Sequence, residues 1–462
     1  MTLIKSISGI RGTIGGKIGN ALTPVDIVKY TSAYAAWLLG KYPNGSKKVI
    51  LGRDARISGE MVNSLVANTL QMMGVDVIDL GLSTTPTVEV MVVKYGAIGG
   101  IILTASHNPK QWNALKLLNA KGEFISAEDG EALMNIAEEE SYDFSEVMSL
   151  GNYSVNTSSL DEHIADILDL ELVNNKLIEQ ANFSVAVDGI NSSGAFAVPA
   201  MLKALGVNNI TVINEEANGH FAHNPEPLAE NLTEISSLIK TNNADLGIVV
   251  DPDVDRLAFV CEDGSMFGEE YTLVAVADYI LENKKGNTVS NMSSTRALRD
   301  ITDRYEGCFN FSSEVGEVNV VKKMKAENAV IGGEGNGGII YPELHYGRDA
   351  LVGIALFLTS LAKKKLSMTA LRDSYPAYTI SKNKIELTPS IDVDAVLETI
   401  YQKYRDEECN RADGLKIYLD QEWVHLRKSN TEPIIRIYTE SESSEKAESL
   451  AIRFMEEIRS SI

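Results

Sequence analysis

A strand–loop–helix–glycine–strand pattern occurs three times in this chain and limits its fold more than any other feature. The first strands of the three copies are predicted at residues 48–52, 184–188 and 287–291. In the third and faintest copy, we expect a helix that continues to Tyr305 and a strand at 308–311. Such a pattern is the βαβ unit, whose crossover makes neighbouring strands parallel. The sequence therefore predicts three similar α/β domains with mixed, mostly parallel sheets.

Each copy leads to a later strand that ends in a loop of unusual composition. These segments are GIILTASHNP at 100–109, LGIVVDPDVDR at 246–256 and AVIGGEGNGG at 329–338. Ligands of open α/β sheets bind beyond the carboxyl ends of the strands. We therefore expect the serine, the aspartates and the glycine-rich loop to converge on one site.

The rest of the chain differs from the repeats. After Pro376, four short strand patterns alternate with helices predicted at 393–405 and 444–458, which is typical of a smaller α+β domain. A helix at 160–170 is expected to bridge the first two domains. The predicted domains are residues 1–150 (serine loop), 151–262 (metal loop), 263–374 (sugar loop) and 375–462 (phosphate loop).

Charge and cysteine content narrow the function classes. The 462 residues carry 42 basic and 64 acidic side chains, a net charge of −22, which argues against nucleic-acid binding. A locally positive cleft for small anions is still compatible with such a chain. The three cysteines are widely spaced and show no metal-ligand pattern, and there is neither a signal-peptide core nor an apolar run of about 18 residues. We expect a cytoplasmic protein with no membrane partner.

Ser106 lies in the first of the three loops. The apolar run before it predicts a buried strand, and Asn108-Pro109 ends that strand because the residue before proline disfavours the helical region. The serine is therefore expected on a tight turn. It is a poor nucleophile unless something activates it. His107 is not expected to serve as its base, because neighbouring residues of an extended segment point to opposite sides.

Three aspartates, Asp251, Asp253 and Asp255, follow the second of these strands. In an extended segment alternate side chains share one face, so the three carboxylates are expected to converge and to require a cation, with Mg²⁺ the best match to hard oxygen ligands. With Glu262 they also occupy EF-hand positions 1, 3, 5 and 12. Position 6, however, is Arg256 rather than glycine, and LAFV after it predicts a strand. A phosphate on Ser106 could supply the missing metal ligand.

Together these motifs resemble the α-D-phosphohexomutase family. TASHNP, DPDVDR, GEGNGG at 333–338 and RKSNTEP at 427–433 occur in the family's order, and SGIRG at 8–12 fits as well. The resemblance spans almost the whole chain. It implies four domains around a central cleft, a phosphorylated serine, and conversion between hexose 6-phosphate and hexose 1-phosphate through a bound 1,6-bisphosphate.

The resemblance also implies roles for individual residues. Ser106 would be the phosphoserine and, with the three aspartates, would hold Mg²⁺. Lys116 would act in proton transfer, Arg256 would face a phosphate, and His107 would have a positional or electrostatic role at the catalytic centre. Substrate binding would involve Arg11, Glu317, Glu334 and Asn336, and a loop for the non-reacting phosphate containing Arg427, Ser429, Asn430 and Thr431.

The identity of the sugar is less constrained than the reaction. The loops GEGNGG and VGE at 315–317 resemble the amino-sugar branch of the family more closely, so glucosamine 6-phosphate is the expected substrate. Mannose or glucose phosphates are the alternative. Asn336, Gly338 and Glu317 depart from the residues common in the family, which bears on the sugar. A hexose 1,6-bisphosphate is the expected activator, and the expected assembly is a monomer or a homodimer. A non-catalytic sugar-phosphate-binding relative is an alternative from another class.

Two other motif matches are rejected on context. Gly333, Gly335 and Gly338 satisfy the dinucleotide pattern G-x-G-x-x-G, but IIYPELHYG after them has no helical periodicity, so the helix that the motif requires is missing. A serine hydrolase would need a G-x-S-x-G elbow, and Ala105-Ser106-His107 is not one.

Overall fold

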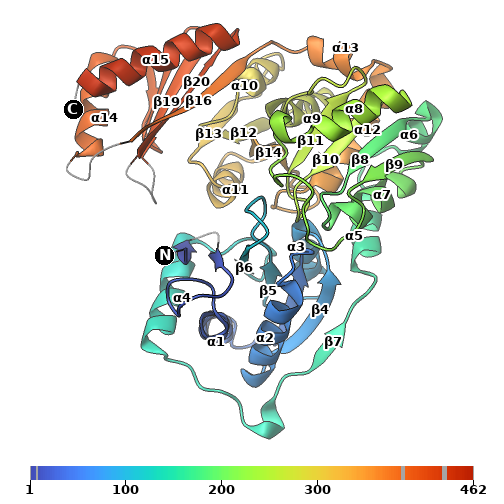
Figure 1. The fold of residues 1–462 in the computed structure, drawn as a ribbon, viewed down its shortest axis with the longest axis vertical. Helices are drawn as coiled ribbons and strands as arrows, with labels where there is room; N and C mark the ends of the chain where they lie inside the picture. Colours follow the sequence, from blue (N-terminus) through green and yellow to red (C-terminus); the bar gives the residue numbers. More distant parts are fainter. Residues whose placement is uncertain (1, 7–8, 387–390, 429–433, 461–462) are drawn as a thin grey trace. The chain divides into compact units, whose positions relative to one another are not determined.

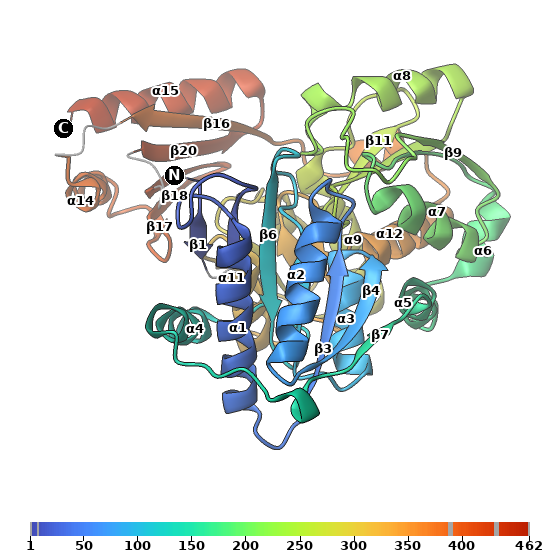
Figure 2. The same cartoon turned by 60° about the horizontal axis from the view of Figure 1, so that its bottom comes forward.

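The computed structural model describes residues 2–6, 9–386, 391–428 and 434–460. The chain forms two compact units, one of residues 1–279 and 336–370 and the other of residues 280–335 and 371–462. Figures 1 and 2 show the elements of both units in two orientations. In the described part of the chain, no helix is long and apolar enough to cross a membrane.

The first sheet of unit 1 has seven strands, and the four strands from β5 to β7 run parallel. Its strands in spatial order are β1 (Ile4–Ser6), β2 (Gly9–Thr13), β6 (Trp112–Leu118), β5 (Gly99–Leu103), β3 (Lys48–Arg53), β4 (Asp76–Leu82) and β7 (Tyr153–Val155). The helices of this region are α1 (Pro24–Lys41), α2 (Gly59–Met72), α3 (Thr85–Lys94) and α4 (Ala127–Glu139).

Helices cover both faces of this sheet, which explains why β5 is apolar throughout. Ile101 and Leu103 pack with the core on the side of α1, α2 and α4, whereas Ile102 packs with the core of α3. Figure 2 shows α1 and α2 along the same face. Thr84 caps α3 by accepting a hydrogen bond from the Thr87 amide, and this fixes where the helix begins.

The second sheet of unit 1 follows the same plan with four strands. Their spatial order is β11 (Leu257–Cys261), β10 (Leu246–Val250), β8 (Ser184–Asp188) and β9 (Asn209–Ile213), antiparallel only between β11 and β10. The other elements of this unit are α5 (Ser159–Leu168), α6 (Asn175–Ala181), α7 (Gly194–Ala204), α8 (Thr233–Asn242), the 3₁₀ turns Val147–Ser149 and Ala229–Asn231, β15 (Gly338–Ile340) and α12 (Ala350–Lys364). The chain enters unit 2 within α9 (Glu269–Asn283), returns to unit 1 after Gly335, and enters unit 2 again within α13 (Met368–Asp373).

Unit 2 contains the third repeat and the C-terminal domain. In the third repeat, β12 (Asn287–Asn291) pairs in parallel with β13 (Asn310–Ser313) and β14 (Ala329–Glu334), accompanied by α10 (Ala297–Thr302) and α11 (Glu317–Ala326). The C-terminal sheet is antiparallel, in the order β16 (Thr379–Glu386), β20 (Ile434–Ser441), β19 (Glu422–Lys428), β18 (Leu415–Leu419) and β17 (Glu408–Asn410). Helices α14 (Val393–Lys403) and α15 (Ser444–Ser460) pack on this sheet.

This architecture confirms the predicted fold class of three α/β domains and a smaller α+β domain. The third repeat differs in detail, because α10 ends at Thr302 instead of reaching Tyr305 and the next strand begins at Asn310. The Tyr305 amide donates to the Thr302 carbonyl, so the chain tightens into turns there. Helices α5 and α14 also end two residues earlier than predicted, at Leu168 and Lys403.

Candidate active site

Ser106 lies on the loop directly after β5, in a left-handed conformation with a φ of 49°. A positive φ is uncommon for residues other than glycine and marks a backbone that its surroundings hold in place. The Ser106 amide donates to Thr104 Oγ1 at 2.9 Å, and its hydroxyl donates to Asp251 Oδ2 at 2.6 Å. The predicted meeting of serine and aspartate loops is thus present, although 145 residues separate the two side chains.

Arg56 holds the loop that contains Ser106 through hydrogen bonds to its backbone, a role that was not predicted from the sequence. Its side chain is inaccessible to solvent and forms an ion pair with Asp54 at 3.0 Å. The guanidinium donates to four backbone carbonyls of the loop, those of Ser106, Asn108, Pro109 and Trp112. Burial raises the pKa of Asp54 in spite of Arg56. The only sequence signal for this pair is its position in the loop after the first repeat strand.

The aspartate loop follows β10 and is held in a compact turn. Asp251 Oδ1 accepts hydrogen bonds from the amides of Asp255 and Arg256, both at 3.1 Å. Val254 has a φ of 62°, a rare conformation for a β-branched residue. The three aspartate side chains converge as predicted from the sequence. They do so because the backbone forms a turn, however, and not because alternate residues of an extended segment share one face.

In Asp253 and Asp255, one carboxylate oxygen accepts hydrogen bonds and the other has none. Asp253 Oδ2 accepts from Thr85 Oγ1 at 2.5 Å and from Lys116 Nζ at 2.7 Å. Asp255 Oδ2 accepts from Arg348 at 2.8 Å and from Lys116 at 3.3 Å. The Oδ1 atoms of both residues are buried and have no hydrogen-bond partner among the described residues. Neither Thr85 nor Arg348 was predicted from the sequence.

This arrangement fits a hard divalent cation. One oxygen from each of Asp251, Asp253 and Asp255 lies within 4.8 Å of the others, and all three residues are buried. Burial and the neighbouring carboxylates raise the pKa of Asp251 well above its ordinary value, whereas Arg348, Lys116 and Arg256 lower the pKa of Asp255. Mg²⁺ prefers such oxygen ligands. It would reduce the repulsion between the carboxylates and would coordinate the two oxygens that lack a hydrogen bond.

The calcium alternative does not fit the same loop. Strands β10 and β11 flank it, whereas an EF-hand loop joins two helices. Glu262, which would occupy the last EF-hand position, accepts hydrogen bonds from the amide and hydroxyl of Thr369 instead.

Lys116 is placed between two carboxylates. Its ammonium contacts Asp253 and Asp255 and is buried with them. Burial alone would lower the pKa of Lys116, but the two carboxylates outweigh burial and raise it above its ordinary value. Lys116 therefore keeps its proton and acts as a cation between the two carboxylates.

Two arginines add positive charge beside the aspartate turn. Arg256 forms an ion pair with Glu226 at 3.2 Å, and its Nε lies 4.0 Å from oxygens of Asp251 and Asp255. Burial and the charge of Arg256 lower the pKa of Arg11, which places these two guanidinium groups within electrostatic reach of each other. Cations gathered around acidic residues are well placed to receive an anionic ligand.

His107 corrects a prediction made from the sequence. Because Ser106 is in a left-handed conformation, the two side chains do not point to opposite sides, and His107 Nδ1 lies 3.5 Å from Ser106 Oγ. Burial and the positive charge of Arg256 lower the pKa of His107 to about 3. The imidazole is therefore neutral, and its low basicity rather than its direction makes it a weak base.

The glycine-rich loop runs from unit 2 into unit 1. Within unit 1, the Leu257 amide donates to the Gly337 carbonyl at 3.2 Å, directly after the aspartate turn. Gly337 has a φ of 82°, and a Cβ there would lie 2.0 Å from the Leu257 carbonyl oxygen, so only glycine fits. Asn336 Oδ1 accepts from the Gly338 amide. Strand β15 rather than a helix follows, which excludes the dinucleotide motif.

In unit 2, the predicted sugar and phosphate residues share one hydrogen-bonded network. Glu334 Oε1 accepts from Asn291 at 2.9 Å and from the Gly316 amide at 3.1 Å, next to Glu317. Asp413 joins this loop to Arg427, because it accepts from the Val315 amide at 3.1 Å and from Arg427 Nε at 2.9 Å. Asp413 was missed in the sequence. Ser429, Asn430 and Thr431 lie outside the described residues.

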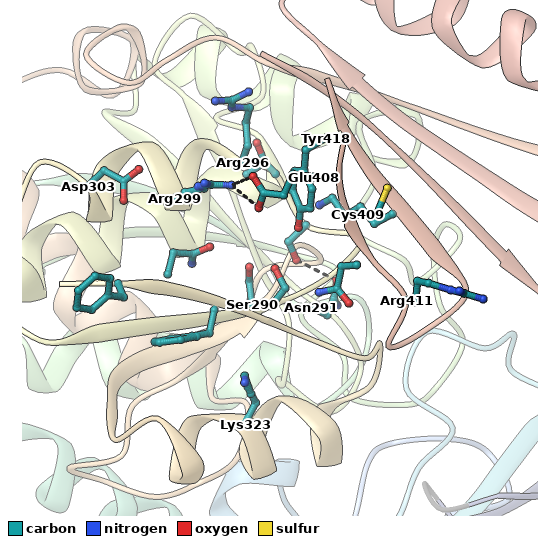
Figure 3. A pocket seen from close by; sticks show the side chains of 18 of the residues that line it. Ser290, Asn291, Arg296, Arg299, Asp303, Lys323, Glu408, Cys409, Arg411 and Tyr418 are labelled. Atoms are coloured by element: carbon teal, nitrogen blue, oxygen red, sulfur yellow. Dashed lines mark hydrogen bonds and ion pairs between the residues drawn. The ribbon is translucent and has the colours of Figure 1, made fainter. Parts of the chain in front are cut away.

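A pocket of about 860 Å³ also lies in unit 2 (Figure 3). Asn291, which contacts Glu334, is part of its wall, together with residues of β13, α10, β17 and β18. Five basic and four acidic side chains line it, and Arg299 pairs with Glu408 at 3.3 Å. We do not assign a phosphate to this pocket, because these nearly balanced charges attract a phosphate only weakly.

Comparison with known proteins identifies relatives along the whole chain. Residues 3–143, 161–264 and 268–378 match the families described as "Phosphoglucomutase/phosphomannomutase, alpha/beta/alpha" domains I, II and III, and residues 384–457 match the C-terminal domain of the same series. A phosphoglucomutase/phosphomannomutase of Thermococcus kodakarensis is 33% identical over 458 residues, covering 96% of this chain and 98% of its own.

Other relatives carry different sugar names. A probable phosphoglucosamine mutase of Methanopyrus kandleri is 31% identical and covers 98% of this chain and 97% of its own. A phosphoglucosamine/phosphogalactosamine mutase of Sulfurisphaera tokodaii is also 31% identical, over 96% of both chains. A phosphoglucomutase/phosphomannomutase family protein of Burkholderia thailandensis has the same fold, with a TM-score of 0.85 at 23% identity over 99% of this chain and 98% of its own.

Fold, site and relatives therefore define a sugar-phosphate mutase, an enzyme that transfers phosphate within its substrate. The chain belongs to the phosphoglucomutase/phosphomannomutase family, the α-D-phosphohexomutases. Its buried aspartate triad fits the Mg²⁺ site expected of this family.

Proposed function

We propose that the enzyme interconverts glucosamine 6-phosphate and glucosamine 1-phosphate, and that Ser106 carries the transferred phosphoryl group. The proposal rests on the contact between Ser106 Oγ and Asp251. This hydroxyl lies beside the aspartate turn, where two buried carboxylate oxygens could bind a cation. A phosphate on Ser106 beside Asp251 would be repelled without a cation. Bound Mg²⁺ would neutralise the charge on the phosphoryl oxygens and ease their transfer.

In the proposed first step, a free hydroxyl of the hexose monophosphate attacks the phosphoserine. The bond between phosphorus and Ser106 Oγ breaks, a bond to the sugar oxygen forms, and the sugar's hydroxyl proton replaces the phosphoryl group on Oγ. We assign this proton exchange to Lys116, which is protonated beside Asp253 and Asp255 and would become a better acid once a bound cation takes up the charge of these carboxylates. The product is a bound 1,6-bisphosphate.

In the second step, the bisphosphate reorients and returns its other phosphate to Ser106. The non-reacting phosphate must be held in both orientations, and we assign this task to the loop that begins at Arg427, with Ser429, Asn430 and Thr431. Arg256 and Arg11 would attract the phosphate at the serine end. A hexose 1,6-bisphosphate from solution would restore phosphoserine after accidental loss, which explains the expected need for an activator.

Two carboxylates in the predicted sugar loops support an amino sugar. Glu334 and Glu317 lie on adjoining segments of unit 2, joined by the hydrogen bond from Gly316. The amino group of a glucosamine phosphate can be a cation, and a carboxylate holds a cationic donor more strongly than a neutral hydroxyl. Relatives with both amino-sugar and neutral-sugar names are about equally similar, so mannose and glucose phosphates stay the alternative.

We expect Glu317→Gln to lower kcat/KM for glucosamine 6-phosphate by about 10-fold or more and to change that for glucose 6-phosphate far less. The reason is that the substitution removes a charge-assisted hydrogen bond of roughly 1.5–3 kcal/mol that only the ammonium group makes. Steady-state rates with both substrates measure it. Glu314→Gln is the matched control, since Glu314 is exposed three residues earlier. An equal loss on both sugars would contradict this role of Glu317.

Chelation should abolish turnover, and added Mg²⁺ should restore it. In Asp253→Asn we expect the Mg²⁺ concentration for half-maximal rate to rise by at least about 10-fold, because the variant lacks one anionic metal ligand. Asp263→Asn is the control, since Asp263 is exposed and contacts Ser265. A Mg²⁺ response of Asp253→Asn identical to that of the unmodified enzyme would reject the metal assignment.

The test of the function is a rate comparison on glucosamine, mannose and glucose 6-phosphates, with Mg²⁺ and the matching 1,6-bisphosphate present. The proposal predicts the highest kcat/KM on glucosamine 6-phosphate. Comparable values on all three sugars would overturn the narrow substrate assignment while leaving the mutase assignment intact. Binding of all three without turnover would instead favour a non-catalytic relative.

A further inference from the structure

Four ionisable side chains form a second buried cluster in unit 1. Glu89 lies on α3, His163 lies on α5, and His345 and Asp349 lie in the segment between β15 and α12. His163 and Asp349 are fully buried, and the side chains of Glu89 and His345 are 1% and 8% exposed. No step of the proposed reaction uses these groups.

Both histidines direct the same nitrogen to the same oxygen. His163 Nε2 lies 3.0 Å from Asp349 Oδ2, and His345 Nε2 lies 3.3 Å from it. Ligand atoms of the three residues are all within 4.8 Å of one another. With metal–ligand bonds of about 2.0–2.1 Å, ligand atoms around a tetrahedral zinc lie roughly 3.3 Å apart, which matches both contacts.

The far side of each of these three groups is held by another partner. His163 Nδ1 lies 3.0 Å from Thr87 Oγ1, and His345 Nδ1 lies 3.3 Å from a Glu89 oxygen. Asp349 Oδ1 caps α12 by accepting the amides of Leu351 and Val352. Metal-binding histidines characteristically donate their other nitrogen to a carboxylate or another oxygen, which fixes the ring. The cluster has this second layer on every ligand.

The charge of the cluster also calls for a cation. Two buried carboxylates, Glu89 and Asp349, contact the two imidazoles at 3.0–3.3 Å. A divalent ion would balance both of them while the two imidazoles stay neutral, as metal binding requires.

We propose that His163, His345 and Asp349 bind a divalent transition-metal ion, with Zn²⁺ the best match to two imidazoles and one carboxylate. Glu89 and Thr87 orient the two histidines. The donor set distinguishes this site from the aspartate turn, whose oxygen ligands favour Mg²⁺. Three protein ligands leave one coordination position for a further donor.

The site would be structural and would brace the aspartate turn. Helix α3 carries Thr85, which donates to Asp253, and Arg348 beside Asp349 donates to Asp255. The ion would join α5 to the start of α12, and Thr87 and Glu89 would hold α3 against its two histidine ligands. Both Thr85 and Arg348 would then be fixed in position. We therefore expect the metal to change stability, and to change the rate only through the position of the aspartates.

Cobalt(II) provides a spectroscopic test, because its colour reports the donor set. The full-length enzyme is freed of metals by chelation, given excess Mg²⁺ to fill the aspartate turn, and then titrated with Co²⁺. We expect one Co²⁺ per chain with the strong visible absorption of a low-coordinate site and with imidazole nitrogen couplings in pulsed electron paramagnetic resonance. The faint absorption of a six-coordinate, oxygen-only site as the sole signal would overturn the proposal.

Variants locate the signal. His163→Gln should lose the nitrogen-coordinated cobalt, whereas Asp253→Asn should keep it. His223→Gln is the matched control, since His223 pairs with Asp188 at 3.0 Å outside the cluster. One equivalent of Zn²⁺ should raise the unfolding temperature of the unmodified enzyme and of His223→Gln, but not of His163→Gln. Retention of the full cobalt signal in folded His163→Gln would also overturn the proposal.

Discussion

Replacing Ser106 with alanine is expected to reduce kcat by at least about 10⁴-fold, the scale of loss seen when a nucleophile is removed. Substrate affinity should change little, because the side chains proposed to bind the sugar and its distal phosphate are unaltered. The cavity left by one hydroxyl is small, and the main hydrogen bond lost is that to Asp251. Turnover measured with bisphosphate present, and affinity measured by calorimetry, separate the two effects.

Ser237→Ala is the matched control for this experiment. Ser237 is exposed on α8 and donates only to a backbone carbonyl within its own helix. Its replacement should leave kcat within experimental error. Near-normal turnover of Ser106→Ala would reject the phosphoserine route, whereas equal loss of binding and rate would indicate that the whole loop has moved.

The second large effect is expected at Arg56. Lysine retains the charge but offers three donors from one nitrogen, so Arg56→Lys cannot satisfy Asp54 and four carbonyls together. Breaking such a buried network costs about 3–5 kcal/mol, which should lower the urea midpoint of unfolding. Displacement of the serine loop by even about 1 Å should lower kcat by roughly 10²-fold.

Arg53→Lys is a matched control three residues away. Arg53 pairs with Glu60, whose side chain is 84% exposed, and donates one hydrogen bond to the Asp54 carbonyl at 3.3 Å, and lysine can make either contact. Its effect on the free energy of unfolding should stay within about 0.5 kcal/mol. An Arg56→Lys enzyme with the stability and rate of Arg53→Lys would show that the carbonyl contacts do not position the serine.

Much of the fold could be predicted because each element carries its own local signal. Strand β5 forms where the apolar run before Ser106 predicts a buried strand, since an apolar run covered on both faces and closed by Asn-Pro has few alternatives. The convergence of Ser106 with the aspartates followed from where parallel strands end. The end of α10 was misplaced because the turn after Thr302 is set by local hydrogen bonds that leave little mark on periodicity.

The supports of the site could not be predicted in the same way. Arg56, Thr85 and Arg348 reach their partners from other segments of the chain, and a lone arginine or threonine in a sequence gives no sign of being buried. The side-chain direction of His107 was wrong because the prediction assumed an extended backbone, whereas Ser106 is left-handed. Only the folded backbone reveals such a turn.

Transfer of label from ³²P-hexose 1,6-bisphosphate tests the central proposal most directly. The enzyme is first freed of phosphate with a phosphatase that is then removed, and it is mixed with the labelled compound and Mg²⁺, quenched within one turnover, and digested for peptide mapping. We expect label on the peptide containing Ser106, released again when unlabelled hexose monophosphate is added before the quench, and no label in Ser106→Ala. Label on another residue, or full turnover with no labelled protein, would contradict it.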